Sequence, residues 1–361
     1  MKVLHVVGAR PNFMKAAPIM REMARYPSEF SQLLVHTGQH YDSRMSQVFF
    51  NELGLPIPDV NLEVGSGSQA WQTAQVMLRF EPVVSDYRPN WVFVFGDVNS
   101  TLACSLVCSK LGISIAHIEA GLRSFDRTMP EEINRMLTDQ IADLLFTPSQ
   151  DAHQNLLREG IPAAKIHFVG NVMIDTLERL LPEANARYPA LQTQFGLDKY
   201  ILVTLHRPSN VDDPETLREF TTALQEISSD ILVLFPVHPR TMQRISEFGL
   251  DTSKSSVKYL QPFGYLDFLA LQSHATLVLT DSGGVQEETT YLNIPCLTAR
   301  ENTERPITIS LGTNRLVKRK STAIVQAIHD RLSEGIGQHQ IPLLWDGRSA
   351  QRIIGVMQKV G

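Results

Sequence analysis

Cysteine is scarce in this sequence, with 3 in 361 residues. Cys104, Cys108 and Cys296 are an odd and sparse set, whereas small secreted domains held by disulfides carry many paired cysteines. The sequence therefore indicates a reducing compartment, and we expect a cytoplasmic protein. Cys104 and Cys108 lie four residues apart on an apolar helical stretch, which favours core packing over metal binding.

Long hydrophobic runs and clusters of basic residues are also missing. No segment approaches the roughly 18 apolar residues that a membrane-spanning helix needs, so we expect no membrane partner. Lys and Arg number 33 against 38 Asp and Glu, a formal net charge of −5. Without clustered Lys and Arg, the chain lacks the electrostatic footprint of a nucleic-acid-binding protein. We expect a small-molecule partner.

The common cofactor motifs are absent as well. No set of His and Cys residues has metal-ligand spacing, and there is no Walker-type glycine–lysine loop. The glycines between Gly65 and Ala70 match a dinucleotide fingerprint. They follow a weak strand, however, and no acidic residue ends the next strand as that motif requires. We expect neither a metal nor a nicotinamide cofactor.

What the sequence does contain is a repeated rhythm of a short apolar run, a turn, and a longer helical pattern. This rhythm is typical of βαβ units around a buried parallel sheet. The composition, 43% hydrophobic and 20% charged, is that of a globular protein, and the length predicts about two domains. We predict an α/β fold of two doubly wound, Rossmann-like domains. The predicted strands are residues 3–7, 33–37, 91–95, 114–118, 144–147, 166–169, 200–204, 231–235, 257–259, 277–280 and 295–297.

The domain boundary is expected near Gly170, giving domains of residues 1–170 and 171–346. Residues 181–199 contain Pro182 and Pro189 without a strong period, which indicates a linker or an exposed pair of helices. A last helix is expected at about residues 347–361, after a loop rich in Pro and Gly.

Ligands of open parallel sheets bind beyond the carboxyl ends of the strands. Seven such positions carry charged, imidazole or glycine-rich groups, more than loop composition alone explains. They are residues 8–11, 37–40, 96–97, 119–123, 206–208, 238–240 and 281–284.

The stretch from Thr280 to Glu288 is a strand end, a small-residue turn and a helix start. Free N–H groups at a helix N-terminus and the helix dipole favour a phosphate there, and Glu288 could accept hydrogen bonds from ribose hydroxyls. The alternative is an ordinary Ser N-cap with first-turn carboxylates. Arg10 and Lys15, after the first strand, would supply cations, or are simply solvated helix residues.

Asp97, Glu119 and Glu131 are expected to converge at one rim of the first domain. Converging carboxylates raise one another's pKa, which prepares a proton donor and a proton acceptor near neutral pH. The alternatives are that Asp97 caps the next helix and that Glu131 complements a helix dipole. His206 and His238 follow strands of the second domain and would face the same cleft, where either would contact a phosphate or act as an acid. The alternative is that each is a structural histidine.

Together these motifs resemble the non-hydrolysing UDP-N-acetylglucosamine 2-epimerase family, over nearly the whole chain. The resemblance implies a two-domain glycosyltransferase-B-type fold with the active site in the cleft between the domains, and a C-terminal helix crossing back to the first domain. It also implies interconversion of UDP-GlcNAc and UDP-ManNAc without metal or nicotinamide, and a homodimer. The motifs that carry it are Gly8-Ala-Arg-Pro11, His36-Thr-Gly-Gln-His-Tyr-Asp42, Gly96-Asp97, His117-Ile-Glu-Ala-Gly-Leu-Arg123, Met129-Pro-Glu-Glu-Ile-Asn-Arg135, His206-Arg207, His238-Pro-Arg240, Thr280-Asp-Ser-Gly-Gly-Val-Gln-Glu-Glu288 and Thr303-Glu-Arg-Pro306.

The resemblance also implies roles for individual residues. The catalytic set would be Asp97, Glu119, Glu131 and His206. The substrate-binding set would be Arg10, Lys15, Phe263, Phe268, Ser282, Gly283, Gly284, Glu288 and Arg305.

Other functions remain open from the sequence. Ser68-Gln69 stands where family members activated by a second UDP-GlcNAc have Arg-Gln. The loop from Arg123 to Met129 resembles relatives that epimerise modified UDP-sugars such as diacetamido uronates. A UDP-sugar transferase of the same fold, a hydrolysing 2-epimerase and a nucleotide-sugar binding module are further alternatives.

Overall fold

The chain folds into two compact units in the computed structural model, which describes all residues except 39–51, 251, 253–255, 336, 338 and 361. Unit 1 comprises residues 1–176 and 343–361, and unit 2 comprises residues 177–342. The chain passes from unit 1 to unit 2 between Thr176 and Leu177, inside one helix.

Unit 1 is built on a seven-stranded parallel sheet in the order β3-β2-β1-β4-β5-β6-β7. The strand order reverses at β1, so right-handed crossovers place helices on both faces of the sheet. The strands are short, and the central strands β1, β4, β5 and β6 are almost wholly buried, as expected for a parallel sheet covered on both sides. The strands of the sheet are β1 (Lys2–Val7), β2 (Ser31–His36), β3 (Val60–Asn61), β4 (Trp91–Phe95), β5 (Ser114–Ile118), β6 (Leu144–Thr147) and β7 (Ile166–Phe168).

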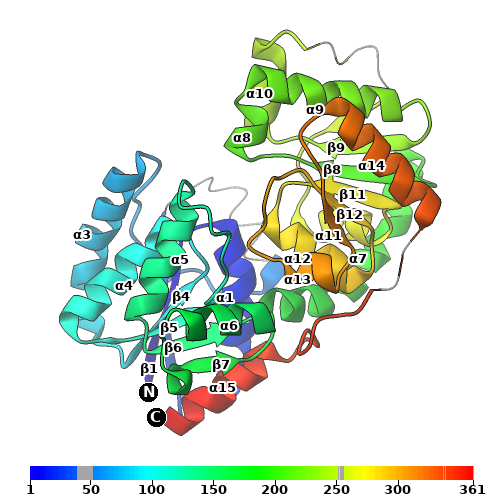
Figure 1. The fold of residues 1–361 in the computed structure, drawn as a ribbon. Coiled ribbons are helices and arrows are strands. Elements are labelled where there is room, and N and C mark those ends of the chain that lie inside the picture. The colour runs from blue at the N-terminus through cyan, green and yellow to red at the C-terminus, as the bar shows by residue number, and fades with distance from the viewer. Residues whose placement is uncertain (39–51, 251, 253–255, 336, 338, 361) are drawn as a thin grey trace. The chain divides into compact units, whose positions relative to one another are not determined.

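The helices of unit 1 cover the sheet in two groups. One face packs against α3 and α4 through a core that includes Val76, Phe80 and Cys104. The last helix of the chain, α15, lies beside α1 (Figure 1). The helices are α1 (Arg10–Met23), α3 (Gln69–Tyr87), α4 (Asn99–Leu111), α5 (Pro130–Ile141), α6 (Gln150–Arg158), the start of α7 (Val172–Phe195) and α15 (Ser349–Val360), with the short 3-10 helix η1 (Ala163–Lys165).

Unit 2 repeats the architecture with a six-stranded parallel sheet in the order β10-β9-β8-β11-β12-β13. Its core includes Phe220, Phe235 and Leu279. The strands are β8 (Tyr200–Thr204), β9 (Leu232–Pro236), β10 (Lys258–Leu260), β11 (Leu277–Thr280), β12 (Cys296–Thr298) and β13 (Asn314–Leu316). The helices are α8 (Pro208–Val211), α9 (Pro214–Ile227), α10 (Pro239–Glu247), α11 (Tyr265–Ser273), α12 (Gly283–Leu292), α13 (Ile307–Ser310) and α14 (Ser321–Glu334).

The segment around Pro182 and Pro189 differs from the sequence prediction. It forms neither a linker nor a pair of helices, because both prolines lie inside the single helix α7. Each proline removes one backbone donor; the tertiary contacts of Leu180 and Ala184, both buried, hold the helix through that loss. Within the described part of the chain, no helix is both long enough and apolar enough to span a membrane.

Candidate active site

Two of the predicted carboxylates lie at neighbouring strand ends in unit 1. β4 and β5 are paired, with Phe95 opposite Ile118, so the residues that follow them emerge side by side. Asp97 follows β4 and Glu119 follows β5. The N–H of Gly96 donates to the carbonyl of Ile118 at 3.0 Å, which joins the two strand ends just before the carboxylates.

Glu119 forms a buried ion pair with Lys15 of α1. Glu119 has φ +71°, a left-handed conformation that costs a non-glycine residue of the order of 1–2 kcal/mol and that gathers at functional sites. Its N–H and that of Ala120 donate to the carbonyl of Phe146, at 3.1 and 3.0 Å. Gly96 packs against the pair, since a Cβ there would lie 2.8 Å from Lys15 Nζ and 3.0 Å from Glu119 Oε2. The backbone thus directs Glu119 at Lys15.

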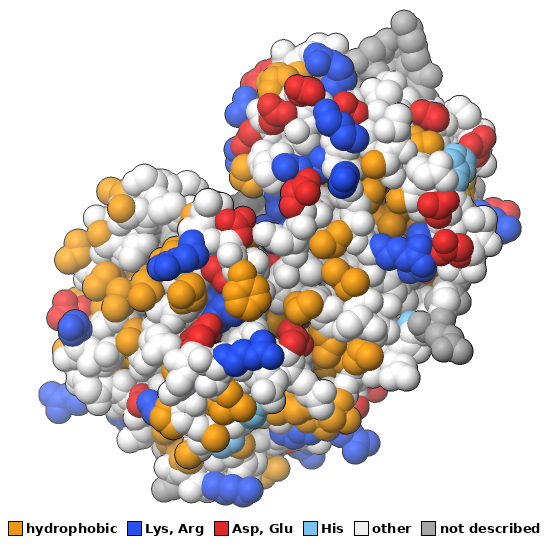
Figure 2. Space-filling model, viewed as in Figure 1, with side chains coloured by type: hydrophobic (Ala, Val, Ile, Leu, Met, Phe, Trp, Pro, Cys, Tyr) orange, Lys and Arg blue, Asp and Glu red, His pale blue; other side chains and the backbone are white. Residues whose placement is uncertain are grey.

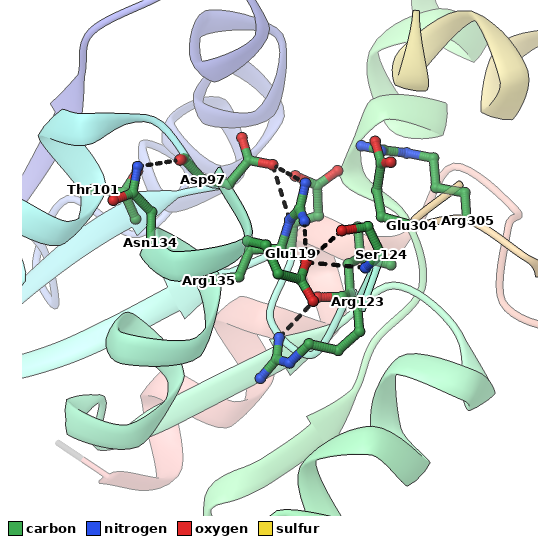
Figure 3. Close-up of polar contacts among 12 residues, drawn as sticks. Asp97, Thr101, Glu119, Arg123, Ser124, Asn134, Arg135, Glu304 and Arg305 are labelled. Carbon is green, nitrogen blue, oxygen red and sulfur yellow. Dashed lines mark hydrogen bonds and ion pairs between the residues drawn. The ribbon is translucent and has the colours of Figure 1, made fainter. Parts of the chain in front are cut away.

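Asp97 is held from α5 by two adjacent residues (Figure 3). Arg135 donates to Asp97 Oδ2 from Nε at 3.0 Å and from Nη2 at 2.6 Å. Asn134 Nδ2 donates to the Asp97 carbonyl at 2.9 Å. The N-cap of α4 is Val98, with no side-chain cap hydrogen bond, so Asp97 is not the helix cap. A quarter of its side chain is exposed, which leaves it accessible to a ligand.

Glu131 and Glu132, adjacent in the first turn of α5, have different surroundings. Glu132 is buried, accepts from Ser124 and Phe125, and pairs with Arg135 Nη1 at 2.5 Å. Glu131 is partly exposed, and its carboxylate makes no hydrogen bond or ion pair among the described residues. Glu132 is therefore a structural carboxylate, whereas Glu131 is available for chemistry. The sequence predicted Glu131; it did not predict Arg135, although Arg135 lies one turn further along the same helix.

Two predicted elements of unit 1 fall outside what the structure describes. Arg10 begins α1, but its side chain is not among the described ones. The motif at residues 39–42 also lies outside the described residues.

In unit 2, Asp281 organises the segment that follows β8. It is fully buried and accepts from the backbone N–H of His206 at 3.0 Å, from that of Arg207 at 2.9 Å, and from Asn210 Nδ2 at 3.0 Å. Burial raises the pKa of Asp281, but the hydrogen bond and charge of His206 outweigh it and lower that pKa below its usual value. The carboxylate is therefore an ionised anchor.

His206 is oriented by this anchor. Its Nδ1 lies 2.9 Å from Asp281 Oδ1, and half of the side chain is exposed. With Nδ1 directed at the carboxylate, Nε2 is the nitrogen left for a ligand. The imidazole of His238, by contrast, caps α10 by accepting from the Arg240 N–H at 3.3 Å, a structural role.

Ser282, Gly283 and Gly284 form the turn between β11 and α12. Ser282 is the N-cap, without a side-chain cap bond, so the first N–H groups of α12 are not satisfied by that hydroxyl. Gly283 is tightly enclosed, because a Cβ there would lie 2.4 Å from Arg305 Nη1 and 2.8 Å from Glu304 Oε1. A glycine turn at the N-terminus of a ten-residue helix suits an anion.

Arg305, predicted as a binding cation, is buried beside that turn and paired with carboxylates. Its Nε lies 2.9 Å from Glu287 Oε1. Its Nη1 pairs with Glu304, which lies beside it in Figure 3. Glu304 also pairs with Arg300 at 2.7 Å and with Arg207 at 3.7 Å. The turn thus has three arginines near it, fixed by two glutamates.

Glu288 is buried in α12 and accepts from the Tyr265 hydroxyl at 2.9 Å. Burial raises the pKa of Glu288 to about 7, although the hydrogen bond from Tyr265 opposes the rise. Phe263, just before α11, contacts Phe195 edge to face with ring centroids 5.9 Å apart. Phe268 lies in α11, partly exposed.

Comparison with known proteins identifies the family. The family model of UDP-N-acetylglucosamine 2-epimerase matches residues 21–358. A UDP-N-acetylglucosamine 2-epimerase of Methanocaldococcus jannaschii is 43% identical over 99% of both chains. A UDP-2,3-diacetamido-2,3-dideoxy-D-glucuronate 2-epimerase of Pseudomonas aeruginosa is 42% identical over 100% of both.

Solved structures agree. The crystal structure of the Methanocaldococcus jannaschii UDP-GlcNAc 2-epimerase in complex with UDP-GlcNAc and UDP has a TM-score of 0.93 to this chain, at 42% identity, covering 99% of this chain and 100% of that one. The resemblance carried by the motifs is confirmed, as is the α/β, glycosyltransferase-B-type fold class. This chain belongs to the UDP-N-acetylglucosamine 2-epimerase family, a family of isomerases.

Proposed function

We propose that this protein is a non-hydrolysing UDP-GlcNAc 2-epimerase that interconverts UDP-GlcNAc and UDP-ManNAc. The observation that carries the proposal is the set of carboxylates at adjoining strand ends of unit 1, with Glu119 buried against Lys15 and Asp97 held by Arg135. Inversion at C2 needs a base on one face of the sugar and an acid on the other, and a cluster of several carboxylates supplies both.

The reaction proceeds in two halves. A base removes the C2 proton, and the electron pair of the C–H bond forms a C1–C2 double bond as the C1–O bond to UDP breaks, anti to the proton. The products of this step are 2-acetamidoglucal and UDP. UDP then adds back to C1 while an acid delivers a proton to the opposite face of C2. Asp97, Glu119 and Glu131 share these two proton transfers.

Unit 2 binds the nucleotide in this proposal. The N–H groups at the start of α12, at Gly283 and Gly284, and the positive end of the helix dipole face the diphosphate. Arg305 adds a positive charge beside the turn, and Phe263 and Phe268 flank the uridine.

His206, fixed through Nδ1 by Asp281 at 2.9 Å, uses Nε2 to stabilise the charge on the departing diphosphate. Arg10 and Lys15 add cations from unit 1, and Glu288 serves the ribose hydroxyls.

The test is hydrogen exchange at C2. Pure protein is incubated with UDP-GlcNAc in heavy water, and C2 is followed by proton NMR. We expect deuterium at C2 together with UDP-ManNAc. Bound UDP-GlcNAc that keeps its C2 proton, with no UDP-ManNAc formed, contradicts the proposal. Release of free ManNAc and UDP identifies a hydrolysing enzyme instead.

A modified UDP-sugar is the second candidate substrate. It is supported by the Pseudomonas aeruginosa relative, which matches this chain nearly as well as the archaeal one does. The same assay with UDP-2,3-diacetamido-2,3-dideoxy-glucuronate compares kcat/KM for the two sugars, and the larger value identifies the substrate.

A glycosyltransferase is disfavoured because sugar transfer does not need the carboxylate cluster. Transfer of the sugar to an added acceptor, without hydrogen exchange at C2, would identify a glycosyltransferase.

We also propose a cytoplasmic homodimer. All three cysteines are free and buried, in keeping with a reducing compartment.

The homodimer is supported by a surface of unit 1. Exposed apolar side chains gather over α3 and α4 (Figure 2). Trp71 and Leu78, one face of α3, are 44% and 65% exposed, and a second copy would cover them. Light scattering after gel filtration is expected to give twice the chain mass, and Leu78→Glu to give the monomer.

A further inference from the structure

His117 occupies the end of β5 without being one of the predicted catalytic residues. It is fully buried and belongs to the strand that delivers Glu119. Its ring contacts two oxygen atoms: Nε2 lies 2.8 Å from the carbonyl oxygen of Gly96, and Nδ1 lies 2.6 Å from Asp139 Oδ1. The ring therefore links the end of β4 to a carboxylate of α5.

Gly96 connects this contact to both catalytic carboxylates. It precedes Asp97 directly, and its N–H donates to the carbonyl of Ile118, the residue before Glu119. Gly96 is thus bonded to β5 twice, through its N–H to Ile118 and through its carbonyl to His117. The same glycine also packs against Glu119 Oε2. A shift of Gly96 would move Asp97 relative to Glu119.

Asp139 is fixed as an anion on the other side of the ring. Its Oδ2 accepts from the Gly121 N–H at 3.1 Å and pairs with Arg123 Nη1 at 2.7 Å. Arg123 in turn makes two hydrogen bonds to Glu159, at 2.8 and 2.7 Å. Burial raises the pKa of Asp139, but the charges and hydrogen bonds of His117 and Arg123 outweigh it and lower that pKa.

These contacts decide the protonation of the ring. A carbonyl oxygen only accepts hydrogen bonds. The Asp139 carboxylate is paired with Arg123 and accepts from the Gly121 N–H, so it too is an acceptor, and both ring nitrogens of His117 donate. The network then holds two positive charges, on the buried His117 and Arg123, and two negative charges, on the buried Asp139 and on Glu159, whose side chain is 27% exposed. Such a balanced, fully hydrogen-bonded network is the form in which charges are tolerated in a protein interior.

We propose that His117, held as an imidazolium by Asp139, is a positioning residue that clamps the ends of β4 and β5 and so sets the placement of Asp97 relative to Glu119. This inference rests on the proposed epimerase function for its effect on turnover. Misplacement of a catalytic group by about 1 Å can cost roughly a hundredfold in rate, so the clamp controls kcat and leaves nucleotide binding by unit 2 unchanged.

The test compares two buried strand histidines of unit 1. In His117→Gln the side-chain amide cannot bond both Gly96 and Asp139 as the ring does. His5→Gln is the matched control, since His5 is equally buried in β1 and bonds Gln32 at 3.0 Å. We expect kcat for C2 exchange to fall at least tenfold in His117→Gln, with KM and the UDP dissociation constant within twofold of wild type. His5→Gln is expected to keep kcat within twofold.

Asp139→Asn is the second variant. With the amide nitrogen turned to Nδ1, a neutral ring still donates from Nε2 to Gly96, so we expect kcat within about fivefold of wild type. Nitrogen-15 NMR of labelled histidine gives a readout that does not depend on turnover: both ring nitrogens of His117 are expected to carry protons in the wild type and one in Asp139→Asn. The change in Asp139→Asn assigns the signals.

Two results overturn the inference. One is a His117→Gln enzyme with wild-type kcat; the other is a wild-type His117 ring with an unprotonated nitrogen. If the wild type exchanges C2 hydrogen in neither UDP-sugar, the proposed function fails, while the NMR result still decides whether the clamp exists.

Discussion

Lys15 and Glu119 form a buried ion pair that joins the first helix of unit 1 to the turn after β5. A buried carboxylate without a partner carries a large desolvation cost, and the ammonium of Lys15 offsets it. The backbone at Glu119 is in addition held at φ +71°. Backbone strain at Glu119 and the burial of its ion pair both cost folding free energy. Because stability alone does not explain such an arrangement, we expect Glu119 to take part in the chemistry.

Glu119→Gln is expected to abolish turnover while leaving UDP binding intact. Glutamine keeps the shape of the side chain but cannot exchange a proton at C2, and loss of a general acid or base costs about 10²–10⁴ in rate. The measurement is kcat for C2 exchange by NMR, with UDP binding by calorimetry. Glu22→Gln, whose carboxylate pairs with Arg25 on the same unit, is the control and should stay active. An active Glu119→Gln removes Glu119 from the mechanism.

Arg135→Met is expected to destabilise the protein strongly. Arg135 bonds Asp97 and also the buried Glu132, so its loss leaves Glu132 without its cation, at a cost of about 3–5 kcal/mol. Arg187→Met is the matched control, because Arg187 pairs with two partly exposed carboxylates in unit 2 and such pairs contribute at most about 1 kcal/mol. Urea unfolding of both variants gives the comparison. Equal losses would show that the Arg135 pairs carry no special weight.

The strands were the best-predicted part of the fold. All eleven predicted strands are present, each within two residues of its predicted ends, because strands buried on both faces are continuous apolar runs. In the part of the chain that the structure describes, the strands that the sequence did not reveal are β3 and β13, of two and three residues. Each contains an asparagine, and Arg315 and Leu316 of β13 are exposed, so neither forms an apolar run.

The sequence predicted where the site residues lie in the fold much better than it predicted which residues they bond. Strand-end location alone placed Asp97 and Glu119, since parallel strands bring their carboxyl ends to one edge. It could not pair Asp97 with Arg135, 38 residues away, or His206 with Asp281, 75 residues away. Such pairings depend on how helices pack across the sheet edge. The prolines of α7 were misleading for a similar reason: packing of the helix outweighs their local preference.

Gly283→Ala is expected to weaken UDP binding at least tenfold. The added methyl group would lie 2.4 Å from Arg305 Nη1 and 2.8 Å from Glu304 Oε1, atoms that belong to a buried ion-pair network and have little room to move. Arg305 would be displaced from the β11–α12 turn. Calorimetric titration with UDP measures the change.

Gly355→Ala is the control for that substitution. Gly355 lies in α15, and a Cβ there meets no described atom within 4 Å. Alanine is the better helix former by roughly 0.8–1 kcal/mol, so this variant is expected to be slightly more stable than wild type, with unchanged UDP affinity. Equal affinities of the two variants for UDP would contradict a tight role for Gly283.

Glu288→Gln is expected to make stability less dependent on pH. The pKa of Glu288 is about 7 in the folded protein, against an ordinary value of 4.5. Between these values the unfolded chain loses a proton that the folded chain retains, so the wild type loses stability as pH rises from about 4.5 to 7, and nothing further above that. Glutamine still accepts from Tyr265 and has no proton to lose. Its stability relative to wild type should therefore increase by about 2.5 kcal/mol between pH 5 and pH 8.

Urea unfolding at pH 5, 6.5 and 8 measures that increase directly. Glu301→Gln, at a side chain that is 63% exposed, controls for the loss of one carboxylate and should run parallel to wild type across the range. A constant difference between Glu288→Gln and wild type at all three pH values would mean that Glu288 is ionised in the folded protein. In that case burial against Tyr265 would not hold the proton, and Glu288 would present a charged acceptor to the ribose at neutral pH.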